Sequence, residues 1–163
     1  MITYTLTPSL KAHQWHITLK FQNYSDSSAV LKLPNWVPGS YLIRDFSRHI
    51  ITISAECDGQ PAALSQTAKN IWQTPPKSGH WVIRYIVYAF DLSVRGSFLD
   101  TNRGFFDGSC LFFSIEGRLK DTHNLSFNDL PKEWRIATSM PTAGSNTFKT
   151  ASYHDLIDHP VEL

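Results

Sequence analysis

The 163-residue sequence has only two cysteines and no long hydrophobic run. Cys57 and Cys110 are too few for a disulfide framework and do not form a Cys-x-x-Cys pair, so we expect two buried free thiols. No run of about 18 apolar residues occurs, and the N-terminus lacks a basic segment followed by an apolar one. We therefore expect a cytoplasmic protein without a membrane partner.

The sequence also lacks an excess of charge of either sign. Its 15 Lys and Arg residues nearly balance its 14 Asp and Glu residues, for a net charge of +1. A chain of this kind has no overall field to hold a nucleic-acid backbone or an anionic membrane. We expect no nucleic-acid partner.

Local motifs for common chemistries are missing. The sequence contains no His-Glu-x-x-His, Gly-x-Ser-x-Gly or Gly-x-Gly-x-x-Gly string. His13 and His16 would point to opposite faces of a strand, whereas a zinc site needs three or four converging ligands. The histidines therefore predict no metal site. The loop carboxylates Asp91, Asp100, Asp107, Asp155 and Asp158 leave a catalytic acid pair open, and no motif selects one.

What the sequence does contain is a strong period of two. From Trp15 to Phe21 every odd residue is large and apolar and every even one is polar, as in a strand with one buried face. The same kind of composition predicts further strands at Thr3 to Thr7, Ala29 to Leu33, Ile50 to Cys57, Asn70 to Gln73, Trp81 to Phe90, Leu111 to Ile115 and Trp134 to Thr138. The fold class that follows is all-β, an antiparallel β-sandwich with long loops. Trp81 to Phe90 is apolar on both parities apart from Arg84, which predicts a central strand covered on both faces.

One short helix is expected near the C-terminus. Ser152 and Asp155 form a capping-box-like pair, and Pro160 prevents continuation of the helix. The longest loop-rich stretches are Asp91 to Ser109 and Thr138 to Asn146, and loops on a rigid sheet are where binding residues usually lie.

Charged and aromatic residues gather at two places in the sequence. Arg44 and Asp45 follow Trp36 and Tyr41, while Arg95, Asp100, Arg103 and Asp107 lie among phenylalanines. Arginine and aromatic side chains together are typical of an interface or a pocket rim. Ion pairs that only support the scaffold would give the same pattern, and short loop carboxylates commonly serve as turn or cap residues.

The segment around the first of these places resembles a known family. The string is Trp36-Val37-Pro38-Gly39-Ser40-Tyr41-Leu42-Ile43-Arg44-Asp45-Phe46, and three further stretches match in order, Tyr85 to Arg95, Arg103 to Gly108 and Tyr153 to Glu162. They are similar to the N-terminal domain of the glycyl aminopeptidase family, gluzincin metallopeptidases that often carry a PDZ domain near the C-terminus.

The resemblance implies that residues 1–163 are a single β-rich N-terminal domain of a larger zinc metalloaminopeptidase. Zinc, the general base and the His-Glu-x-x-His helix would then lie in a catalytic domain outside this chain. The resemblance therefore implies no catalytic residue and no metal ligand here, and we expect this chain alone to be inactive. The implied partners are that catalytic domain and a peptide substrate. The candidate residues for domain docking or the substrate cleft are Trp36, Tyr41, Arg44, Asp45, Arg95, Asp100, Arg103 and Asp107. Among them, Asp100 and Asp107 are candidate partners of a substrate α-ammonium group.

Two other functions stay open. The chain could be an independent ligand- or carbohydrate-binding β-sandwich that stacks a sugar on Trp15, Trp36, Trp72, Trp81 or Trp134. It could also be an interaction domain that forms a homodimer through an exposed docking face.

Overall fold

The computed structural model describes residues 1–163 and places a large sheet over two smaller ones. The large sheet has the strand order β13-β14-β12-β1-β2-β8-β4-β5. Its strands are β1 (Ile2–Ser9), β2 (Gln14–Asn23), β4 (Ile50–Cys57), β5 (Gln60–Ala62), β8 (Gly79–Tyr88), β12 (His123–Phe127), β13 (Thr142–Gly144) and β14 (Thr147–Thr150).

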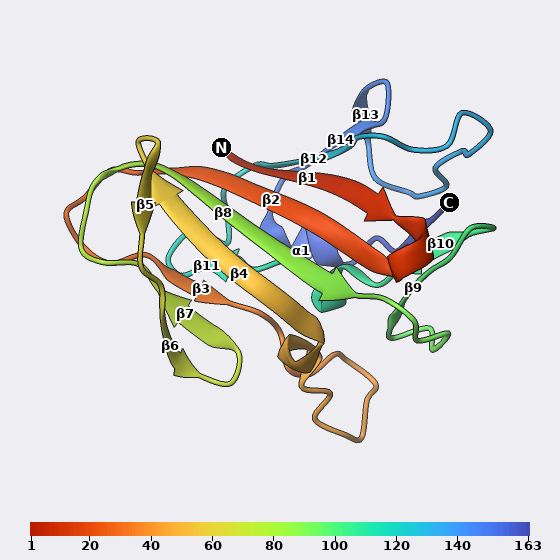
Figure 1. Cartoon of the computed structure of the whole chain (residues 1–163), viewed down its shortest axis with the longest axis horizontal. Coiled ribbons are helices and arrows are strands. Elements are labelled where there is room, and N and C mark those ends of the chain that lie inside the picture. Colours follow the sequence, from red (N-terminus) through yellow and green to blue (C-terminus); the bar gives the residue numbers. More distant parts are fainter.

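The smaller sheets and one helix lie on the other side of the core. One has the order β11-β3-β7-β6 and the other β15-β10-β9. Their elements, with the helix α1, are β3 (Val30–Lys32), β6 (Ser65–Ala68), β7 (Ile71–Gln73), β9 (Ser97–Leu99), β10 (Gly104–Phe106), β11 (Ser114–Ile115), α1 (Tyr153–Ile157) and β15 (Val161–Glu162). In Figure 1 the large sheet lies in front, and α1 and β11 lie behind it. Three short 3-10 helices, Leu10–Ala12, Phe46–His49 and Gly108–Cys110, complete the fold, and none of the helices has the length and apolar character needed to cross a bilayer.

The alternation seen in the sequence builds the core. In β2, Trp15, Ile17, Leu19 and Phe21 are all buried, while the residues between them lie on the outer face of the sheet. Trp15 packs edge-on against Phe106 of β10, with ring centroids 5.7 Å apart. The all-β sandwich is therefore confirmed, and apolar burial between its layers is the main source of its stability.

The single helix is also confirmed. The Ser152 hydroxyl accepts a hydrogen bond from the Asp155 backbone N–H at 3.1 Å, and Asp155 Oδ2 accepts one from the Ala151 N–H at 2.9 Å. These two bonds satisfy backbone donors that a helix start leaves free.

The large sheet is not purely antiparallel as predicted. Strand β1 pairs with β12 in parallel, so the sheet is mixed.

β8 is central, between β2 and β4, but the prediction that both its faces are covered is wrong. Arg84 and Tyr88 are exposed, and Arg84 pairs with Glu56 of β4 at 2.8 Å. The smaller sheets and α1 cover only the inner face of the large sheet. Among the apolar residues of β8 that alternate with the inward-facing set, Val82 is buried, Ile86 is half-buried and Tyr88 is exposed.

Some strand predictions were also wrong. Trp134 to Thr138 forms only an isolated bridge between Ala137 and Glu162, and only the end of Leu111 to Ile115 is a strand. The sequence reading missed β12, because its inward residues include a buried histidine, His123, which interrupts the apolar alternation. It also missed β9 and β10, three-residue strands inside a stretch read as a loop.

Three buried tyrosines hold the segment that follows the 3-10 helix Gly108–Cys110. The hydroxyls of Tyr85 and Tyr153 donate to the carbonyls of Leu111 and Phe112 at 2.7 and 2.8 Å, and the Tyr4 hydroxyl donates to the carbonyl of Phe113. Burial raises the pKa of Tyr85 and Tyr153 well above its ordinary value, so both remain neutral donors. Three consecutive carbonyls are thus satisfied inside the core.

Candidate functional site

The loop after β3 is shaped by a type II turn. The Ser40 N–H donates to the Val37 carbonyl at 3.1 Å, and Gly39 has φ +77°, the left-handed conformation that this turn requires at its third position. The Trp36 indole N–H donates to the Ser40 carbonyl at 2.8 Å. Pro38 and Gly39 are the residue types that a type II turn favours at its second and third positions.

Arg44 closes the same loop from inside. Its Nε donates to the Ser40 hydroxyl at 3.0 Å, and its backbone N–H donates to the Asn35 carbonyl at 2.7 Å. With both ends held in this way, the residues between them bulge outward. Tyr41 is fully exposed, and Leu42 and Ile43 are 66% and 64% exposed.

A second loop, between β8 and β9, lies beside the first. Asp91 Oδ1 accepts from the Ser93 N–H at 2.9 Å, which fixes a turn in this loop. Arg95 Nη2 donates to the Gly39 carbonyl at 3.0 Å and ties the two loops together across 56 residues of sequence. Figure 1 shows the first loop in orange at the lower edge and the second in green at the right.

The paired loops carry an exposed apolar surface. We call it the two-loop surface, defined by Trp36, Tyr41, Leu42, Ile43, Leu92 and Val94. Leu92 and Val94 are largely exposed and come from the second loop. Apolar side chains exposed together on two joined loops are candidates for an interaction site.

A groove of about 1040 Å³ borders the two-loop surface. Trp36, Val94, Arg95, Asp107 and α1 residue His154 are among its lining residues. Asp107 Oδ1 accepts from the Ser109 N–H at 2.8 Å and so begins the 3-10 helix that follows it. Asp107 therefore caps this 3-10 helix and also lines the groove.

The structure brings some predicted residues together and separates others. Trp36, Arg95 and Asp107 line the groove, while Tyr41 and Arg44 belong to the neighbouring loop. Asp45 lies apart from the groove and pairs with Lys69 at 3.5 Å.

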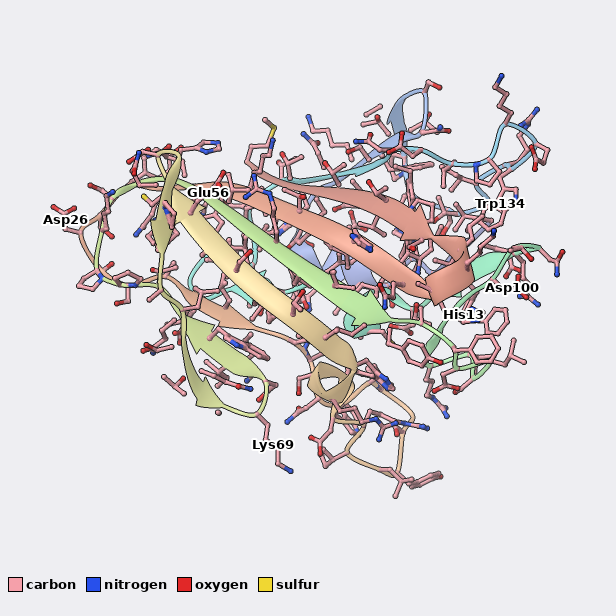
Figure 2. The ribbon with its side chains drawn as sticks, in the orientation of Figure 1. His13, Asp26, Glu56, Lys69, Asp100 and Trp134 are labelled. Carbon is pink, nitrogen blue, oxygen red and sulfur yellow. The ribbon has the colours of Figure 1, made fainter.

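Asp100 and Arg103 are in a different part of the molecule, the turn between β9 and β10. Asp100 accepts the N–H groups of Asn102 and Arg103, and these bonds lower the pKa of its carboxyl. Arg103 pairs with Glu162 at 2.6 Å. Figure 2 shows Asp100 at the right and Lys69 at the lower edge, well separated. Both residues of the turn are engaged in local scaffold contacts.

The strongest feature missed by sequence reasoning is the run Leu42-Ile43 with Leu92 and Val94. The available signal was the position of apolar side chains directly after turn residues, where no strand could bury them. The two loops that carry them are joined by the hydrogen bond from Arg95 to Gly39, which no local pattern reveals.

The tryptophans form no platform for stacking a sugar. Trp15 and Trp81 are fully buried, Trp72 is 6% exposed and Trp134 is half-buried. Only Trp36 is exposed, at 47%, and it belongs to the two-loop surface. This arrangement speaks against the carbohydrate-binding alternative.

The chain has no group of three or more His, Cys, Asp or Glu residues that could hold a metal ion. Cys57 and Cys110 are buried free thiols, and burial raises the pKa of both. The residues present therefore do not fit a catalytic zinc centre.

Comparison with known proteins agrees with the fold. The crystal structure of an aminopeptidase N family protein from Idiomarina loihiensis superposes with a TM-score of 0.94 at 38% sequence identity. The match covers 99% of this chain and 29% of that chain, so this chain spans less than a third of that protein. No curated protein matches. The model of the Peptidase M61 N-terminal domain matches residues 3–163, and the chain belongs to this family.

Proposed function

We propose that this domain docks through the two-loop surface onto the catalytic domain of an M61 zinc aminopeptidase and helps to shape its substrate cleft. The observation that carries the proposal is the set of six exposed apolar side chains on two mutually fixed loops. Each square ångström of apolar surface removed from water contributes about 25 cal/mol, so covering these side chains favours association.

The loops are suited to docking because their backbones are already ordered. Trp36, Arg44 and Arg95 each hold the first loop by a hydrogen bond to its own backbone or to a side chain within it. Ordering loops on binding costs free energy, and a preformed surface avoids much of that cost. The superposed aminopeptidase supports the proposal, since most of that chain lies outside the part matched here.

The groove beside the loops is the proposed binding site for the N-terminal end of a peptide substrate. Asp107 and Asp158 line it together with Trp36 and Val94. A carboxylate there would pair with the α-ammonium group of a peptide, and the apolar residues would wall a small side chain. Zinc, held by the catalytic domain, would supply the activated water, and this chain would contribute only binding and orientation.

Two exposed tyrosines provide a matched test. Tyr41 lies on the two-loop surface, whereas Tyr24 is 81% exposed in the loop between β2 and β3. In the longer, zinc-loaded protein that the proposal requires, Tyr41→Ser should lower kcat/KM for glycyl and alanyl anilides about tenfold, equivalent to about 1.4 kcal/mol. Tyr24→Ser should leave it unchanged. Equal effects of the two substitutions would refute the proposal.

A further inference from the structure

A small pocket lies between the two loops and the large sheet. Its volume is about 30 Å³, and its lining includes Arg44, Arg48, Arg95, His49, Asp91 and Ser97. A site for one water needs about 10–15 Å³, so this pocket can take the end of one side chain but not a peptide.

The three arginines in this pocket have free donors. None of them lies within 4.0 Å of a carboxylate, although Arg84, Arg103 and Arg118 elsewhere in the chain all form ion pairs. Each of the three makes a hydrogen bond through one nitrogen, to Ser40, His49 or Gly39. A guanidinium has five N–H donors, so most of the donors at this pocket remain available.

Other charges around the pocket do not cancel the arginines. Asp91 is its only carboxylate, and one of its oxygens is engaged by the Ser93 N–H. Burial and the nearby Arg48 guanidinium lower the pKa of His49, which leaves that ring neutral at pH 7. The residues that line the pocket thus carry three positive charges and one negative charge.

Ser97, another lining residue, is buried. The residue is 6% exposed, and its hydroxyl oxygen has no hydrogen-bond partner. A buried polar atom left unpaired costs about 1–3 kcal/mol, so native proteins seldom keep one without a reason. Because this oxygen is shielded from solvent, a ligand in the pocket would be recognised through the arginines and not through Ser97.

We propose that the pocket of Arg44, Arg48 and Arg95 binds the carboxylate of one Asp or Glu side chain of the catalytic domain. The inference rests on the docking function proposed above and adds the chemistry of the partner. A carboxylate offers two acceptor oxygens in one plane, which matches the planar arrangement of N–H donors on a guanidinium group. The apolar two-loop surface around the pocket would exclude water from this contact and strengthen it.

Acetate tests the pocket without the partner. In the 163-residue chain, titration with sodium acetate at constant ionic strength should shift the amide NMR signals of Gly96 and Ser97 saturably. Arg48→Gln, at an exposed position, should weaken acetate binding about fivefold or more, whereas Arg135→Gln, which removes an exposed arginine elsewhere, should not. Linear, unsaturated shifts, or equal loss in both variants, would overturn the assignment.

The longer protein separates this inference from the docking proposal. Hydroxyl-radical oxidation of Tyr41 should rise about threefold or more in Arg48→Glu at about 0.15 M salt, and not in Arg135→Glu. If Tyr41 is protected in the wild type and Arg48→Glu leaves it protected, the carboxylate anchor is wrong and docking stands. If Tyr41 is unprotected in the wild type, docking fails, and with it the assignment of the occupant to the catalytic domain.

Discussion

Removing one hydroxyl tests how the fold holds the segment beside the groove. Tyr85 is 1% exposed, and its hydroxyl donates to the Leu111 carbonyl at 2.7 Å. Tyr85→Phe keeps the ring, which packs edge-on against Phe113 with centroids 5.0 Å apart, and deletes only the donor. The Leu111 carbonyl then remains buried without this partner.

The expected cost is about 2 kcal/mol, within the range of about 1–3 kcal/mol for a buried polar group left unsatisfied. For a domain of this size, 1 kcal/mol corresponds to about 2–4 °C, so Tm should fall by about 4–8 °C. Thermal unfolding followed by circular dichroism would measure it. Tyr41→Phe, at a fully exposed position, is the matched control and should change stability by less than about 0.5 kcal/mol.

A Tm for Tyr85→Phe that matches the control would refute the reasoning, because the Tyr85 hydroxyl would then contribute no net stability. Combining Tyr85→Phe with Tyr153→Phe is the sharper form of the experiment. Their acceptors, Leu111 and Phe112, are adjacent, so the two losses should not add.

Two more outcomes follow from the same structure. Burial lowers the pKa of His123 to about 4. Between this value and the unfolded pKa of about 6.5, the unfolded chain binds a proton at His123 and the folded chain does not. The free energy of unfolding should therefore fall by about 3 kcal/mol between pH 6.5 and pH 4. Urea unfolding across this range should show the loss, and His123→Leu should flatten it; an equal slope in both proteins would contradict this origin. Calorimetry should detect no tight zinc binding by the 163-residue chain, and glycyl and alanyl anilides should not turn over; one-to-one binding with turnover would contradict the placement of the metal site elsewhere.

Local periodicity was sufficient for the parts of the fold that are set by local chemistry. The apolar residues of β2 alternate with polar ones, and the structure buries the apolar set. Ser152 and Asp155 predicted a helix start that the hydrogen bonds confirm. In both cases the residues that interact lie within a few positions of one another.

The predictions that were wrong concern features that depend on contacts between segments far apart in the sequence. β8 was read as covered on both faces, but which face is covered depends on where the smaller sheets pack. Asp100 and Asp107 are seven residues apart and were read as equivalent, yet one holds the turn between β9 and β10 and the other lines the groove. The candidate site itself rests on the contact from Arg95 to Gly39, across 56 residues.

Side-chain oxidation footprinting is the most direct test of whether the two-loop surface is covered by another domain. The 163-residue chain and the longer protein would be oxidised side by side, and the rates at Tyr41, Leu92 and Tyr24 compared. Docking predicts strong protection of Tyr41 and Leu92 in the longer protein and an unchanged rate at Tyr24. Equal oxidation of Tyr41 and Leu92 in the two samples would mean that the two-loop surface faces water, and would contradict the account.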